Sequence, residues 1–342
     1  MARKKPSALE LAMVAAVGER GFTVSPTQLE RWCNQLWLPR TGEWSAPGTG
    51  GLRPEIVHRA AALAGISRTG RKISWFGWGF WAIDATAEST TRLRAAVADA
   101  FERPFRRAGI DFGQIPQGDS DEAFDARQEM AARMLKDRRC PRRDFDGTLR
   151  AGAAGAEFEL PPTRSVSNIG HPALMDPGAR LMLGGAQDVG FEEMAEAWEA
   201  ATPGNPEMIE HIRAAQRDAA LAGDDLVAQS PLAGGLPGIV RAVQEADGER
   251  LCTAVLACIK ASTALTMLLA HAVNEPGILR TLMADEMWDQ WVRVGYAPVL
   301  GIGGEAAVAM SVFQHLLMPG WTEGLERYQS LMDTLLTQPA TV

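Results

Sequence analysis

The sequence has only four cysteines in 342 residues, and they are scattered along the chain. Small secreted domains that depend on disulfides are much richer in cysteine, so the chain does not fit a disulfide-stabilised scaffold. A signal peptide is also missing, because the basic start at residues 3–5 is followed by Pro6 and a mixed helix in place of an apolar core with a cleavage site. These absences predict a soluble globular protein of the cytoplasm.

One apolar run, Leu251–Val273, is long enough to approach the thickness of a bilayer core at about 1.5 Å per residue. Lys260 lies near its middle, where a lysine costs roughly 2.5–3.5 kcal/mol on membrane-insertion scales. We therefore expect a helix buried inside a globular domain, and no membrane partner.

Motifs of common enzyme classes are missing or stand in the wrong context. The sequence has no Gly-x-Ser-x-Gly elbow, no P-loop and no HExxH pair. Gly301–Ala306 matches the dinucleotide pattern GxGxxA, but the 36 residues that follow cannot supply the strand that this fingerprint needs. The histidines and cysteines lack metal-ligand spacing. We expect no enzymatic activity, no metal and no cofactor.

Charge is distributed unevenly along the chain. Residues 1–110 hold 16 Lys and Arg against 9 Asp and Glu, a net charge of +7, and the remainder holds 18 against 33, a net charge of −15. A basic first third on an acidic body predicts that any polyanion binds to the first third.

Apolar residues recur with helical spacing through most of the chain, and no series of alternating strands is present. In the first third, helices are expected at 7–17, 25–38, 54–66 and 87–107. Residues 73–83 are ambiguous, since two glycines disfavour a helix and five aromatic residues allow a strand. A basic helix is expected at 126–139, and further helices at 190–201, 205–222, 236–246, 250–274, 278–294, 304–317 and 321–336.

These segments predict a mainly α protein with three regions. Residues 1–110 are expected to form a winged helix-turn-helix domain with a small wing, and residues 111–170 a linker that carries the basic helix. Residues 171–342 are expected to form an acidic, all-helical domain for dimerisation or for an effector, either a small apolar ligand or a protein partner.

The helix at 25–38 carries most of the functional information. Ser25, Pro26 and Gln28 form a capping-box start, and a Gly-containing turn joins the segment to the helix before it, as in a helix-turn-helix. The start of such a second helix reaches base edges in the major groove, where Gln pairs with adenine and Arg with guanine. The candidate DNA-binding residues are Thr27, Gln28, Arg31 and Gln35 on this helix, with Arg40 and Arg53 flanking a glycine-rich loop.

The stretch Gly21–Trp32, followed by Leu36–Arg40, resembles the recognition helix and wing entry of the MerR-like winged helix-turn-helix family, in its actinobacterial and phage-type variant. Residues 48–54 stand where that family carries its glycine-rich wing. The resemblance covers residues 20–66 well and 1–108 loosely, and it implies binding of double-stranded DNA as a homodimer. The sequence departs from the family at Leu36 and Trp37, where a glycine is usual.

The sequence suggests three alternative functions. The first is a transcriptional regulator that reads DNA through residues 25–38, with 40–53 as its wing. The second is an architectural DNA-binding factor of a phage or mobile element, and the third is a helical protein-interaction scaffold that does not bind DNA.

Overall fold

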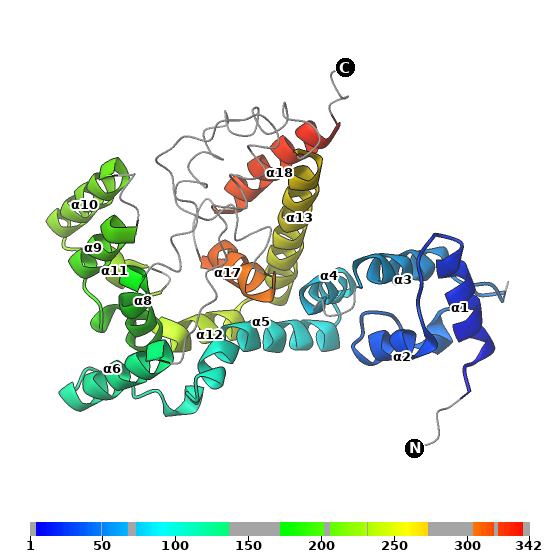
Figure 1. Cartoon of the computed structure of the whole chain (residues 1–342), viewed down its shortest axis with the longest axis horizontal. Coiled ribbons are helices and arrows are strands. Elements are labelled where there is room, and N and C mark those ends of the chain that lie inside the picture. Colours follow the sequence, from blue (N-terminus) through cyan, green and yellow to red (C-terminus); the bar gives the residue numbers. More distant parts are fainter. Residues whose placement is uncertain are drawn as a thin grey trace. The chain divides into compact units, whose positions relative to one another are not determined.

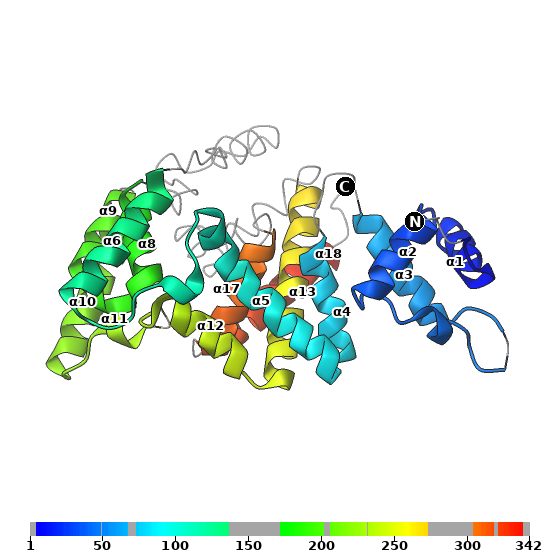
Figure 2. The same cartoon turned by 90° about the horizontal axis from the view of Figure 1, so that it is seen from below.

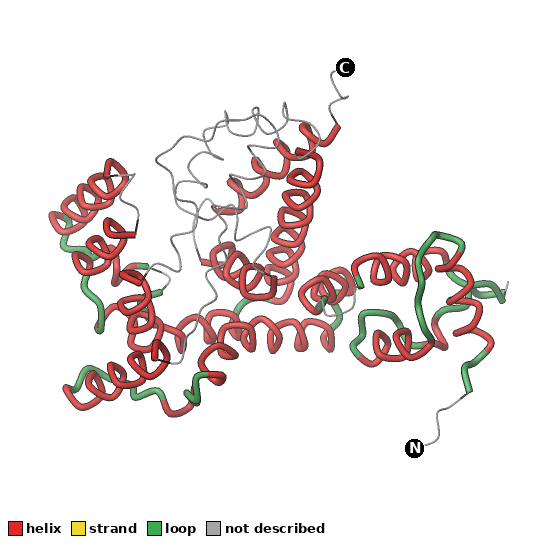
Figure 3. The backbone as a smooth tube through the Cα atoms, viewed as in Figure 1, coloured by secondary structure: helices red, strands yellow, loops and turns green. Residues whose placement is uncertain are grey.

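The computed structural model describes residues 5–48, 50–67, 73–136, 172–201, 206–230, 232–272, 304–317 and 321–337. Within these ranges the fold is built from helices and loops, and no strand is drawn (Figure 3). The prediction of a mainly α protein is therefore confirmed. The chain divides into two compact units, residues 1–96 and 97–342, and the division falls within helix α5 (Ala87–Arg107).

The first unit contains α1 (Ala8–Gly18), α2 (Pro26–Asn34), the short 3₁₀ helix η1 (Thr41–Glu43), α3 (Pro54–Ile66), α4 (Ser74–Asp84) and the start of α5 (Figure 1). Helix α1 packs against both α2 and α3. The core of this unit is large and aromatic for its size, and its fully buried members include Met13, Leu29, Trp32, Leu38, Trp44, Leu63, Trp78 and Leu93.

Helix α4 occupies the segment whose sequence pattern is ambiguous. Gly77 is buried in this helix, and a Cβ added there would lie 2.2 Å from Cε2 of Trp37. The glycine is therefore required by the close approach of a tryptophan ring and not by an unusual backbone angle. The contact between Trp37 and Gly77 joins residues that lie 40 positions apart, so the local sequence does not indicate it. Judged by helix propensity alone, Gly77 disfavours a helix that the structure nevertheless contains.

The second unit continues from α5 through the 3₁₀ helix η2 (Phe112–Gln114), α6 (Asp121–Lys136), α8 (Pro172–Gly184), the 3₁₀ helix η4 (Gly185–Gln187), α9 (Phe191–Ala201), α10 (Pro206–Leu221) and α11 (Leu226–Gln229). It ends with α12 (Gly235–Glu245), α13 (Gly248–Ala272), α17 (Gly304–Leu317) and α18 (Trp321–Thr337). Helix α13 packs against α17 and α18, and Figure 2 shows these three helices side by side. Helix α8 packs against α6, α9 and α12.

Most helices expected in this part of the chain are present, within a few residues of their expected bounds. The helix expected at 278–294 lies outside the described residues. Helix α8 was not expected, because Pro177 and Gly178 interrupt its pattern. Helix α6 lies in the segment that the sequence suggests is a linker, and it packs against α8.

A buried ion pair joins α6 to the turn after α8. Arg127 and Asp188 are 1% and 0% exposed, and the Arg127 side chain donates two hydrogen bonds to the carboxylate, from Nε at 2.7 Å and from Nη2 at 2.6 Å. The Nη1 atom of Arg127 also donates to the backbone carbonyls of Pro116 and Gly118, both at 2.9 Å. Nearly all donors of this guanidinium are therefore paired, which is the condition for burying such a charge.

Among the described residues, no helix has both the length and the apolar content required to cross a bilayer. The helix that raised this question in the sequence, α13, carries Lys260 as an exposed side chain. Its buried residues, which include Leu251, Ala254 and Val255, form a core face, and the helix packs against α17 and α18.

Candidate nucleic-acid interface

Helix α2 begins at a complete capping box. The backbone N–H of Gln28 donates to Oγ of Ser25 at 3.2 Å, and Oε1 of Gln28 accepts from the backbone N–H of Ser25 at 2.9 Å and from its hydroxyl at 3.0 Å. The predicted N-terminal cap is confirmed. The side-chain oxygen of Gln28, a predicted DNA-binding residue, is thus used to start the helix.

The two faces of α2 differ sharply in exposure. Leu29 and Trp32 are 0% exposed and belong to the core. The opposite face has four exposed polar residues at positions i, i+3, i+4 and i+7, which form one ridge along the helix. We call this set the α2 ridge; it consists of Thr27, Glu30, Arg31 and Asn34. It contains two of the predicted site residues, and Gln35 is exposed at the C-cap directly after it.

The loop between α2 and α3 contains a single antiparallel bridge, between Ser45 and Leu52, in place of a hairpin of strands. Trp44 anchors this loop, since its buried indole N–H donates to the carbonyl of Pro39 at 2.9 Å. At the exposed tip, Gly48 and Gly50 adopt positive φ angles of 80° and 63°. The loop therefore has a fixed base and exposed glycines at residues 48 and 50, and a wing built of strands is not found in the described part of this segment.

The two arginines that flank this loop differ in their surroundings. Arg40 is exposed, and no side-chain partner is found for it among the described residues. Arg53 pairs with Glu55 at 2.6 Å, and these side chains are 44% and 60% exposed. The backbone N–H of Glu55 at the start of α3 lowers the pKa of its carboxyl, and Arg53 lowers it further. An exposed pair of this kind is weak, so a phosphate can compete for Arg53.

The C-terminal end of α2 has a Schellman geometry with an unusual residue at its centre. Leu36 has a φ angle of 55°, in the left-handed region that glycine normally occupies. The N–H of Trp37 donates to the carbonyl of Trp32 at 2.8 Å, and the N–H of Leu36 donates to that of Cys33 at 3.0 Å. The helix therefore ends at Asn34, four residues before the end expected at residue 38, and Leu36 occupies the position where glycine is usual in this motif.

Four consecutive carbonyls at this end of α2 each accept a hydrogen bond from a side chain of another helix. Arg92 of α5 donates to Asn34 at 3.0 Å, and Trp81 of α4 donates from its indole N–H to Gln35 at 2.7 Å. Arg59 of α3 donates to both Leu36 and Trp37. We call these three side chains, Arg59, Trp81 and Arg92, the α2 anchor.

Arg59 is itself held in place. Its guanidinium donates to both carboxylate oxygens of Asp84, at 2.7 and 2.8 Å, and lies 4.4 Å from the centre of the Phe80 ring. Arg59 and Arg92 also place positive charge at the negative end of the α2 dipole. Local sequence reasoning missed the α2 anchor because its members lie 22 to 58 residues from the carbonyls that they bind.

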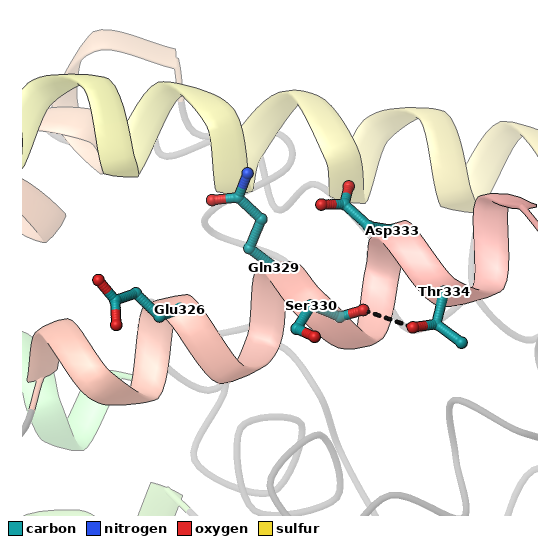
Figure 4. A pocket seen from close by; sticks show the side chains of 5 residues that line it. All are labelled: Glu326, Gln329, Ser330, Asp333 and Thr334. Atoms are coloured by element: carbon teal, nitrogen blue, oxygen red, sulfur yellow. Dashed lines mark hydrogen bonds between the residues drawn. The ribbon is translucent and has the colours of Figure 1, made fainter.

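In the second unit, a shallow hollow of about 420 Å³ lies on α18. It is lined by side chains of one helix, those of Glu326, Gln329, Ser330, Asp333 and Thr334 (Figure 4). The small apolar ligand expected for this domain stays a prediction. Within the described ranges, no cluster of three or more metal-ligating side chains is found.

Comparison with known proteins identified no relative of this chain. No family model matches the chain, and no match was found among curated proteins or among solved structures.

Proposed function

We propose that the protein binds double-stranded DNA sequence-specifically through α2 and acts as a transcriptional regulator of the MerR-like winged helix-turn-helix type. In this proposal α2 is the recognition helix, the loop at 40–53 is the wing, and the protein works as a homodimer in the cytoplasm. The α2 ridge carries the proposal, because it places a row of exposed polar side chains on a helix whose other face buries Leu29 and Trp32 in the core.

The chemistry of the α2 ridge suits the edges of bases. Arg31 is exposed and has no side-chain partner among the described residues, so its fork of donors is available for O6 and N7 of guanine. Asn34 lies three residues further along the same face, where its amide suits N6 and N7 of adenine. Glu30 accepts hydrogen bonds only, so it suits the amino group of cytosine and is repelled by phosphates.

The charge of the first unit supports the same partner. Residues 1–96 hold 13 Lys and Arg against 7 Asp and Glu, a net charge of +6, although the whole chain has a net charge of −8. Arg59 and Arg92 are committed to the α2 anchor, whereas Arg31 and Arg40 have no such commitment. A positively charged unit of this size attracts DNA and leaves base reading to the α2 ridge.

The proposal is tested by selecting bound sequences from a random duplex library with the full-length chain. Arg31→Ala is expected to weaken binding to the selected sequence by about 5- to 150-fold and to relax the preference at one base pair. Arg241→Ala is the matched control, because it removes the same charge from an exposed position on α12 in the second unit.

The proposal is supported if a sequence is selected and its binding is weakened by Arg31→Ala and not by Arg241→Ala. If no sequence is enriched even at low salt, the protein does not bind DNA sequence-specifically. That result would favour the alternative function as a helical protein-interaction scaffold. If binding is tight but equally weakened on all sequences by Arg31→Ala, then Arg31 contacts phosphate and α2 does not read bases through it.

A further inference from the structure

We infer that Arg59, Trp81 and Arg92 are positioning residues that set the angle of α2 and thereby its choice of DNA sequence. This inference rests on the proposed function. It assigns a role in recognition to side chains of α3, α4 and α5 that do not belong to the α2 ridge, and it makes the reading unit larger than the helix-turn-helix and its wing.

The geometry separates two ends of α2. At the start, the capping box is made entirely from Ser25 and Gln28, so it holds the helix to itself and to no other element. At the other end, the carbonyls of residues 34–37 are bound by side chains of three different helices. The position of α2 is therefore fixed at its C-terminal end by hydrogen bonds from three other helices, in addition to the packing of Leu29 and Trp32 in the core.

Small rotations about that end matter for base reading. A helix of nine residues is about 13 Å long, so a tilt of about 10° at one end moves the other by about 2 Å. Stacked bases are about 3.4 Å apart along a strand, and hydrogen bonds weaken steeply once they leave a range of a few tenths of an ångström. A loosened α2 anchor would therefore impair reading of bases by Arg31 while contacts to the flexible, uniformly charged phosphates persist.

This reasoning predicts a particular signature. In a folded variant with a weakened α2 anchor, affinity for the selected duplex should fall. Affinity for a scrambled duplex should stay at its wild-type value, so the two affinities should become more alike. The dependence of affinity on salt should also stay constant, because it reports the number of phosphates neutralised. Reduced folding, in contrast, would lower the two affinities by the same factor.

The test uses two conservative variants of the full-length chain. Trp81→Phe removes the indole donor but keeps an aromatic ring, and Arg59→Lys keeps the charge but loses the fork that serves Asp84, Leu36 and Trp37 together. The matched control is Trp78→Phe, which makes the same replacement in the same helix at a buried indole outside the α2 anchor. Circular dichroism and the unfolding midpoint confirm that each variant is folded at the assay temperature.

We expect Trp81→Phe and Arg59→Lys each to lower the ratio of specific to non-specific affinity at least about fivefold, and Trp78→Phe to leave it at the wild-type value. An unchanged ratio in folded Trp81→Phe and Arg59→Lys overturns this inference alone, provided that the wild-type chain selects a sequence. A wild-type chain that selects no sequence overturns the proposed function as well.

Discussion

Gly77→Ala in α4 is expected to destabilise the first unit, although the same replacement in an exposed helix stabilises. The added Cβ would lie 2.2 Å from Cε2, 2.3 Å from Nε1 and 2.7 Å from Cδ2 of Trp37, compared with ordinary contacts of 3.4 Å or more. Trp37 is a buried residue with 7% of its surface exposed, so its ring has little free space into which it can move. The substitution therefore forces a displacement of buried aromatic atoms.

The magnitude follows from two opposing effects. Overpacking of a well-filled core costs typically about 1–3 kcal/mol, and a conflict of three ring atoms belongs in the upper half of that range. Alanine in place of glycine returns about 1 kcal/mol through its better helix propensity. The net loss in the free energy of unfolding should be about 1–2 kcal/mol.

Urea unfolding of the full-length chain, followed by tryptophan fluorescence, measures this loss, because six of the ten tryptophans lie in residues 1–96. Gly18→Ala is the control, since nothing lies within 4 Å of a Cβ added at the end of α1, and it should leave stability unchanged or raise it by up to about 1 kcal/mol. In a Trp37→Leu background, Gly77→Ala should lose most of its cost. If it destabilises equally there, or if Gly77→Ala is as harmless as Gly18→Ala, the packing argument is wrong.

Two further predictions concern a thiol and a buried charge. Burial raises the pKa of the Cys33 thiol from 9.0 to about 11, so iodoacetamide at pH 8 should modify Cys33 about 100-fold more slowly in the folded chain than in urea, as read by peptide mapping. Equal or faster alkylation of the folded chain would contradict this prediction. Because the pKa of Cys33 is higher in the folded chain than in the unfolded chain, the stability contributed by its burial should be lost as the pH rises from 9 towards 11. Arg127→Met should lower the free energy of unfolding by about 3–5 kcal/mol, because it leaves Asp188 buried without its cation, and Arg127→Met with Asp188→Leu should recover part of that loss. A cost below about 1 kcal/mol for Arg127→Met, measured by urea unfolding, would show that water or another cation replaces Arg127.

The sequence was sufficient for features that depend on neighbours along the chain. The capping box at Ser25 appears with both of its hydrogen bonds, and the helices at 54–66 and 87–107 have the expected bounds. Each of these rests on residues within one or two helical turns of one another, where propensity, capping and spacing act together. The exposure of Arg31 follows in the same way from the burial of Leu29 and Trp32 on the other face.

Features that depend on contacts between distant segments could not be read from the sequence. Gly77 counts against a helix locally, yet α4 needs it so that Trp37 can pack against the helix. Pro177 and Gly178 likewise interrupt the pattern of α8, a helix that packs against three others. The α2 anchor is of the same kind, since no local pattern distinguishes Arg59 from an arginine that simply faces solvent.

Leu36 shows how such distant contacts can replace a local signal. A left-handed φ angle costs a residue with a Cβ about 1–2 kcal/mol, which is why glycine is usual at the end of a helix. Here the carbonyls of Gln35 and Leu36 accept hydrogen bonds from Trp81 and Arg59, and these contacts offset the cost of the conformation. The end of α2 is therefore determined by α3 and α4 as much as by its own residues, and the same side chains that permit Leu36 are the ones that we propose orient the helix towards DNA.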